Sequence, residues 1–453
     1  MRPESLFALI CMFLAFVVPP SAVAATATSL EREATDAYHR ADYAAVLRLL
    51  PPDGSEIKPT KAFLRLALES ATKTGRPEEG LAIYERLVQA GHAEDPALLR
   101  QLGISFLSAY VRDGREYLRI AAYSALAELS LPDQQAILED GLLDGSPIVR
   151  ARAVEALGRA GLASKSQALR RTLHDENPSV RIAAMNALSD AQVTDVMPRL
   201  TDVARTEDGP EAVFAYAALY RLGKQDMLAD ITAAATLPDP ETRMAALGIL
   251  GRLKRPASLN VLSQGVYDPE PPVRAFAAGA LGEFGQPGAV APLTHALGDE
   301  HARVRAVAAT SLGRVGTKDS RPLLHALTRD ASMQVRAGAI EGLLRLGDQS
   351  AVLIAADLAR HPDPSIRAAA AQALSAASDK QALAILQTLL QDQQPQPRLF
   401  AAKTLGKLAL PVLPLVKKGL HDSDPAVRIT AAGSLLHYLN SAAKSSARGG
   451  RKG

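Results

Sequence analysis

The stretch DEHARVRAVAATSLGRVG, from Asp299 to Gly316, decides the fold of this chain, because its pattern recurs along most of the sequence. Taking Arg305 as the reference position, the equivalent residues are Arg119, Arg150, Arg181, Ala212, Arg243, Arg274, Arg336, Arg367, Arg398 and Arg428. The period is 31 residues, and only the last step is shorter, at 30. A fixed period of this length indicates a solenoid of eleven stacked repeats.

Two positions inside the repeat are the same residue in all eleven copies. An alanine lies three residues after the reference position, and a leucine lies seven residues after it, as Ala308 and Leu312 do. Four residues separate the two, so they share one helical face, where alanine allows close approach and leucine fills space. A second apolar helix precedes each acidic turn, as in Ala289–Leu297 (AVAPLTHAL). The sequence therefore predicts an all-α chain, an α-solenoid stacked as a superhelix of about eleven two-helix repeats.

Each repeat also carries a helix-start signal. In eight repeats an aspartate lies six residues before the reference position, and a proline often follows three residues later. The resulting pattern, D-x-x-P-x-V-R-x-x-A-A-x-A-L-G, is well matched by Asp144–Gly158 (DGSPIVRARAVEALG). It resembles the HEAT repeat, in particular the short bilin-lyase-like (PBS lyase) class, over roughly residues 108–440.

The HEAT resemblance implies that these acids and arginines form a hydrogen-bonded ladder between neighbouring repeats. By position, the ladder would comprise Asp144 and Arg150, Asp175 and Arg181, Asp268 and Arg274, Asp299 and Arg305, Asp330 and Arg336, and Asp422 and Arg428. The repeat at Thr206–Gly223 lacks both the acid at its usual place and the arginine, and it carries Asp208 and Ala212 instead. That break indicates a bend, a contact site or simple sequence drift.

The N-terminal part lies outside the 31-residue register. Residues 1–24 have the pattern of a secretory signal peptide, with an apolar run at Leu6–Val18, too short to favour a spanning helix, and an A-x-A cleavage site at Ala22–Ala24. We therefore expect a periplasmic or otherwise secreted mature protein with no transmembrane segment. Residues 25–107 are predicted to be irregular and helical, and Gly75–Leu87 (GRPEEGLAIYERL) resembles a tetratricopeptide (TPR) helix. This region is interpreted as a cap or as a second peptide-binding module.

Charge and cysteine content exclude several classes of function. Cys11 is the only cysteine, and it would leave with the signal peptide, which excludes disulfides and thiolate chemistry in the mature chain. The tail at residues 441–453 carries four of the basic residues and is predicted to be disordered. The formal charge of the chain is +3, so the rest sums to −1. This near neutrality argues against nucleic acid as a partner.

We find no motif that carries enzyme chemistry. The sequence has no P-loop, no H-E-x-x-H and no G-x-S-x-G, so no catalytic residue, cofactor or metal site is expected. In several repeats the ninth residue after the reference position is an arginine or lysine, and together these residues form a basic row. In three repeats the second residue after the reference position is a phenylalanine. The candidate partner-binding residues are Arg159, Arg221, Arg252, Arg314, Arg345, Lys407, Phe214, Phe276 and Phe400.

The basic row has two interpretations. The HEAT resemblance implies that this helix lines the concave surface, where arginines and aromatics are typical of interface hot spots. Alternatively, cations near helix C-termini merely stabilise the helix dipole, by about 0.3–1 kcal/mol. The favoured function is a non-enzymatic scaffold that binds a protein or peptide on its concave face. A bilin-lyase-like or chromophore-handling enzyme and a structural cell-envelope assembly factor are the alternatives. Partner identity, solenoid curvature and oligomeric state stay open.

Overall fold

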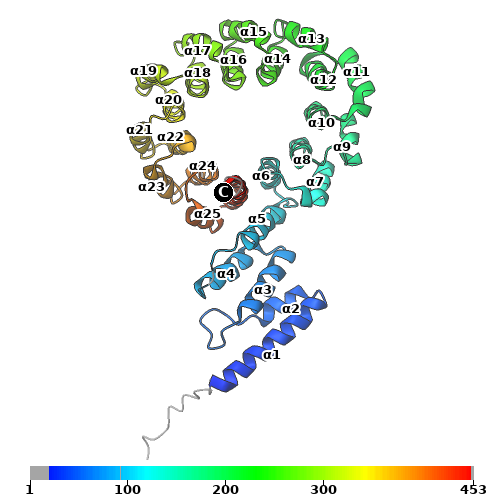
Figure 1. Cartoon of the computed structure of the whole chain (residues 1–453), viewed down its shortest axis with the longest axis vertical. Helices are drawn as coiled ribbons and strands as arrows, with labels where there is room; N and C mark the ends of the chain where they lie inside the picture. Colours follow the sequence, from blue (N-terminus) through cyan, green and yellow to red (C-terminus); the bar gives the residue numbers. More distant parts are fainter. Residues whose placement is uncertain (1–19, 92, 450–453) are drawn as a thin grey trace, which may run out of the picture. The chain divides into compact units, whose positions relative to one another are not determined.

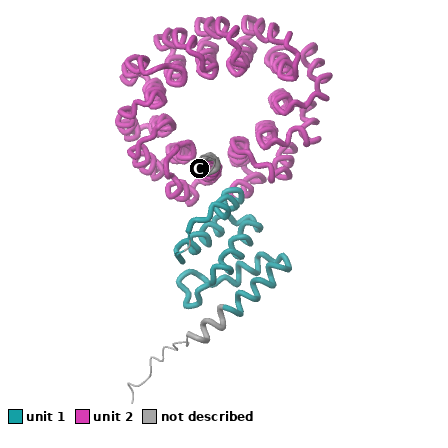
Figure 2. The backbone as a smooth tube through the Cα atoms, viewed as in Figure 1, with its two compact units in different colours: residues 1–105 teal, residues 106–453 magenta. Residues whose placement is uncertain are grey.

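The structure is a computed structural model that describes the backbone of residues 20–91 and 93–449 and the side chains of residues 28–91 and 93–443. The chain divides into two compact units, residues 1–105 and residues 106–453 (Figure 2). Most of the predicted signal peptide lies outside the described residues, so export stays a prediction.

Unit 1 is a small helical array. Its helices are α1 (Pro20–His39), α2 (Tyr43–Leu49), α3 (Lys61–Lys73), α4 (Pro77–Gln89) and α5 (Pro96–Tyr110), the last of which continues into unit 2. Helices α3 and α4 pack together at Gly80, where an added Cβ would lie 3.2 Å from Leu102 and 3.5 Å from Leu68. Glycine at this position therefore sets the close approach of α4 to its neighbours. The TPR resemblance of this region stays a prediction.

Unit 2 is built of helix pairs in two layers (Figure 1). The inner layer consists of α6 (Glu116–Ala127), α8 (Pro147–Arg159), α10 (Pro178–Asp190), α12 (Gly209–Arg221), α14 (Pro240–Leu253), α16 (Pro271–Phe284), α18 (Ala302–Val315), α20 (Met333–Arg345), α22 (Pro364–Ala373), α24 (Pro395–Leu405) and α26 (Pro425–Gly449). The outer layer consists of α7 (Gln135–Asp140), α9 (Gln167–Arg171), α11 (Met197–Thr206), α13 (Met227–Ala234), α15 (Leu259–Gln264), α17 (Val290–Ala296), α19 (Arg321–Leu327), α21 (Ala351–Leu358), α23 (Lys380–Leu389) and α25 (Leu413–Leu420). The predicted all-α solenoid is confirmed, and the described residues contain no strand.

The repeated alanine and leucine form the core between the layers. All eleven alanines at the third position after the reference residue are 0% exposed, and all eleven leucines at the seventh position are at most 3% exposed. Proline occupies the first helical position of several inner helices, including α8, α10, α16 and α26, where its missing N–H costs no hydrogen bond. The predicted packing role of these residues is confirmed.

The first and last repeats of unit 2 pack against each other, so the solenoid closes into a ring (Figures 1 and 2). At this seam between α6 and α26, a Cβ added to Gly433 would lie 3.2 Å from the Cβ of Ala125. Lys403 Nζ lies 3.0 Å from Glu128 Oε1, and Arg428 Nη2 donates to Tyr110 Oη at 2.6 Å. Each repeat thus turns the stack by about 33° on average, as eleven equal steps require.

Small residues allow the inner helices to come close enough for this curvature. The eighth residue after the reference position is glycine in five repeats, and it packs on the sixth position of the next repeat. At Gly313, an added Cβ would lie 2.3 Å from the Cα of Gly342, and at Gly251 it would lie 2.7 Å from the carbonyl oxygen of Ala280. Neighbouring inner helices approach closely at these small residues, whereas leucine side chains hold the layers further apart toward the outside. This difference bends the stack toward its inner face.

The C-terminal tail differs from the prediction. Residues 441–453 were expected to be disordered, but α26 continues to Gly449. The reason is that Ser441–Arg448 contains alanine, lysine and arginine, which are good helix formers that extend a helix already nucleated by packing. No helix within the described part of the chain is both long and apolar enough to cross a bilayer.

Candidate functional site

The reference arginines bind the start of the next repeat. Arg305 donates from Nε and Nη2 to the two carboxylate oxygens of Asp330, each at 2.9 Å, and from Nη1 to the carbonyl oxygens of Asp299 at 2.7 Å and Glu300 at 3.0 Å. Arg305 therefore bonds the carboxylate of the following repeat and the main chain of its own. The same arrangement joins Arg119 to Asp144, Arg150 to Asp175, Arg243 to Asp268, Arg274 to Asp299, Arg367 to Asp392 and Arg398 to Asp422.

The ladder carboxylates are mostly buried, and several of them have lowered pKa values. The hydrogen bonds from Arg305 hold the pKa of Asp330 below its usual range, against the raising effect of burial. Burial alone would raise the pKa of Asp299, but Arg274 and the backbone N–H of His301 outweigh it, and the pKa is lowered. The pKa values of Asp144, Asp175 and Asp392 are lowered in the same way. These arginines are engaged within the fold.

Between successive repeats, the ladder is interrupted at two joints. The repeat at Thr206–Gly223 supplies Glu211 in place of the missing aspartate, and Arg181 bonds both of its carboxylate oxygens, so the break lies only on the far side, where Ala212 replaces an arginine. At the second joint, His361 stands at the acid position. Among the described residues no carboxylate pairs with Arg336, which donates to the carbonyl oxygen of Asp330 at 2.6 Å.

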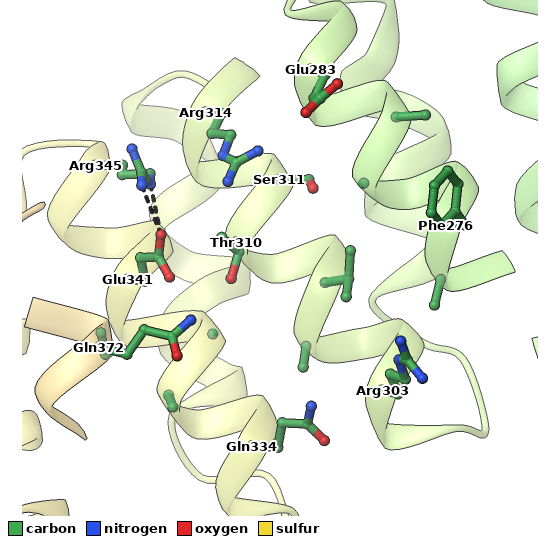
Figure 3. Close-up of a pocket in the computed structure, with 18 of the residues that line it drawn as sticks. Phe276, Glu283, Arg303, Thr310, Ser311, Arg314, Gln334, Glu341, Arg345 and Gln372 are labelled. Carbon is green, nitrogen blue, oxygen red and sulfur yellow. Dashed lines mark hydrogen bonds and ion pairs between the residues drawn. The ribbon is translucent and has the colours of Figure 1, made fainter. Parts of the chain in front are cut away.

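A groove lies on the inner face of unit 2 (Figure 3). We call it the inner groove; it has a volume of about 840 Å³ and is lined by α14, α16, α18, α20 and α22, with Lys407 beyond α24. Its wall between α16 and α20 is made of small residues, among them Gly279, Ala306 and Gly338, and the half-buried Thr310 and the buried Ser311 lie along its middle. Charged side chains stand toward its edges, with Arg314 and Arg345 together at one edge and Arg303 toward the other (Figure 3).

The structure brings five of the predicted binding residues together in the inner groove. These are Arg252, Arg314, Arg345, Lys407 and Phe276. Arg345 pairs within its own helix with Glu341, at 2.8 Å from Nη2. The ring of Phe276 is 46% exposed and lies against Gly248, where a Cβ would come within 2.7 Å of it.

The other predicted residues have different surroundings. Arg221 is largely buried, bonds Asn186 Oδ1 at 3.0 Å and lies 3.3 Å from Asp190, and burial lowers its pKa. Phe214 is half-buried, and the Arg252 guanidinium carbon lies 5.9 Å from its ring centroid. Neither Arg221 nor Phe214 lines the groove, and neither do the exposed Arg159 and the half-buried Phe400.

Several groove residues were missed in the sequence. Arg303, Gln334, Glu283, Glu341 and Gln372 also line the groove, and the sequence analysis named none of them as binding residues. A signal for them exists, because positions −2, +2, +5 and +9 relative to the reference residue share one helical face at about 100° per residue. The predicted binding residues come only from the second and fourth of these positions. Within the described residues, no three His, Cys, Asp or Glu side chains gather closely enough to hold a metal ion.

Comparison with known families identifies the repeat. A family model described as HEAT repeats matches residues 138–219, 262–332 and 320–398, which lie within the ring. The solenoid is built of HEAT repeats. The family match does not include residues 25–107.

Solved structures that resemble this HEAT-repeat chain are remote. One is the complex of CpcE and CpcF of phycocyanin lyase from Nostoc sp. PCC7120, at 19% identity and a TM-score of 0.37, covering 53% of this chain and 94% of that chain. Another is human deoxyhypusine hydroxylase, at 19% identity and a TM-score of 0.30, covering 62% and 97%. A third is Kap121p bound to Nup53p, at 14% identity and a TM-score of 0.35, covering 89% and 50%. No curated protein matches the sequence.

Proposed function

We propose that this HEAT-repeat protein is an exported, non-enzymatic scaffold that binds a linear segment of a protein partner in its inner groove. The observation that carries the proposal is the inner groove itself, in which Arg314 and Phe276 are exposed on rigid helices of the stack. The backbone that carries these side chains is already ordered by packing, so binding needs no loop or helix ordering, and modest contacts from several repeats can sum to useful affinity.

The ring geometry favours a linear segment over a folded domain. Eleven inner helices spaced by about 9 Å give a circumference of about 100 Å and a diameter of about 30 Å between opposite helix axes. Helix radii of about 5 Å on each side reduce the free width to about 20 Å. A domain of about 100 residues is wider than this, at about 30 Å across, whereas an extended chain or one helix fits.

Selection from a library of linear 12-residue peptides tests the proposal. Selected peptides should bind the mature protein, and the double replacement Arg314→Ala with Arg345→Ala should weaken binding roughly tenfold, since each charged contact contributes up to about 1 kcal/mol. Replacing the exposed Arg159, which holds the same position in a repeat outside the groove, is the matched control. Failure to select any peptide, or equal loss in the control, would refute the groove assignment.

Export is the second part of the proposal and has its own test. The A-x-A site at Ala22–Ala24 supports cleavage after residue 24. N-terminal sequencing of the protein recovered from the cell that makes it should therefore begin at Ala25. Recovery of an intact N-terminus would contradict this part while leaving the groove assignment standing.

A further inference from the structure

We infer that the segment bound in the inner groove is an acidic polypeptide in extended conformation, with carboxylates about three residues apart and an apolar side chain against Phe276. This inference rests on the proposed function and names the chemistry of its partner. Its basis is the charge, the pairing and the spacing of the residues that line the groove.

The groove concentrates the positive charge of the chain. Five cations line it, namely Arg252, Arg303, Arg314, Arg345 and Lys407, against two carboxylates, Glu283 and Glu341. The C-terminal tail carries four more positive charges, so the rest of the chain outside the groove and the tail sums to −4. A cationic concavity on an otherwise acidic body attracts a negatively charged partner to that place.

The groove cations are available to a partner. Within the described residues, no ion pair is formed by Arg303, Arg314 or Lys407, and all three are exposed in the groove. Arg345 does have an internal partner, since it bonds Glu341 (Figure 3). The ladder arginines differ from these residues. Where the next repeat supplies a carboxylate, the ladder arginine forms an ion pair with it, as Arg305 does with Asp330.

The spacing of the groove cations fits an extended chain. Arg314 and Arg345 hold equivalent positions in neighbouring repeats, which stack about 10 Å apart. An extended polypeptide advances about 3.3 Å per residue, so carboxylates three residues apart meet successive repeats. Phe276, over Gly248 and one repeat further toward the N-terminus, provides the apolar contact.

The same features favour a peptide over a nucleic acid. Strong binding to a phosphate backbone needs a continuous set of cations, because each neutralised phosphate contributes separately. In this groove Glu283 stands at the equivalent position between Arg252 and Arg314, and Glu341 engages Arg345. A peptide that places its apolar side chain at the repeat of Phe276 and Glu283, and its carboxylates at the flanking repeats, avoids Glu283, whereas a uniform polyanion cannot.

Three matched 12-residue peptides test the inference by fluorescence anisotropy on the mature protein. They share one central leucine and carry Asp, Asn or Lys at every third position. The Asp peptide should bind at least tenfold more tightly than the Asn peptide, and Arg314→Glu should reduce that binding about tenfold while improving binding of the Lys peptide. Arg159→Glu, the matched control outside the groove, should change neither affinity.

The outcomes separate this inference from the proposed function. If the library selection yields groove-binding peptides that are neutral or basic, or if the Asn peptide binds as well as the Asp peptide, the acidic partner is refuted and the scaffold function stands. Tighter binding of a (dT)20 oligonucleotide than of the Asp peptide would also overturn the inference, in favour of nucleic acid. If neither the library nor the designed peptides bind, both proposals fall together.

Discussion

Replacing Arg305 with alanine should destabilise the ring far more than the same change at Arg336. The two arginines occupy the same position in adjacent repeats, and both are half-buried. Arg305 makes two charge-assisted hydrogen bonds to Asp330 and two hydrogen bonds to carbonyl oxygens of its own repeat, whereas Arg336 makes one among the described residues, to a carbonyl oxygen. The lost side-chain packing is matched in the pair, so the difference in stability reports mainly the contact with Asp330.

The magnitude follows from burial and remaining partners. Removing one member of a buried ion pair costs about 3–5 kcal/mol, because the other charge stays desolvated. The side chains of Arg305 and Asp330 are 18% and 10% exposed, and Asp330 retains a hydrogen bond from the backbone N–H of Ser332 at 2.8 Å. We therefore expect the lower end for Arg305→Ala, about 3 kcal/mol. A single hydrogen bond predicts about 1 kcal/mol for Arg336→Ala.

Urea unfolding of the protein, followed by circular dichroism and by intrinsic tyrosine fluorescence, measures this difference. Coincident transitions from the two probes are required, because a repeat array can unfold in parts. With matched slopes, the two variants should differ by about 2 kcal/mol in the free energy of unfolding. Equal destabilisation, or a larger loss for Arg336→Ala, would refute the claim that the carboxylate of the next repeat is what the arginine contributes.

Three further predictions concern the ring. Ala125→Cys with Gly433→Cys should form a disulfide across the seam, because the Cβ separation of 3.2 Å is close to the 3.5–4.5 Å that disulfides adopt; non-reducing electrophoresis should show the crosslink, and a linear product would argue against closure. Gly313→Ala should cost about 1–3 kcal/mol in urea unfolding, because its Cβ would collide with Gly342, whereas Gly279→Ala, which meets only ordinary contact, should not destabilise; equal costs would contradict the packing account. The ladder aspartates with lowered pKa bind fewer protons when folded than when unfolded, so their stabilisation is complete above the unfolded value of about 4 and is lost as pH falls through the folded pKa; unfolding midpoints that do not fall below pH 4 would contradict this.

The sequence was sufficient to predict the fold, because the same pattern of buried and helix-starting residues recurs in nearly every repeat. Alanine and leucine four residues apart fix the buried face, and the aspartate and proline fix the helix start. Ring closure was not predicted. Closure depends on small rotations summed over eleven joints. The size of each rotation follows from contacts between neighbouring repeats, such as that of Gly313 with Gly342, which the sequence pattern does not specify.

The candidate site was predicted in part for a similar reason. The ninth position after the reference residue was selected as one row, yet Arg314 faces the groove while Arg221 is buried against the preceding repeat. The position in the repeat is the same for both arginines, so it does not predict which one is buried. The residues of the neighbouring repeat decide this. Arg221 has oxygen atoms of Asn186, Ser189 and Asp190 within reach, whereas no described carboxylate pairs with Arg314.

The ring therefore uses one residue type for two purposes, and position decides which. At the reference position, most inner helices carry an arginine that meets an acidic residue of the next repeat, as Arg305 meets Asp330, so its charge is satisfied inside the fold. Near the end of α18, no described carboxylate pairs with Arg314, and its charge is left for solvent or a partner. Closure of the ring strengthens this division, because with neither end of the stack free to splay, the distance between Arg314 and Arg345 is held by packing on both sides. Preorganised spacing lowers the cost of binding only for a partner whose charges match it, which is how a ladder that serves stability also contributes to specificity.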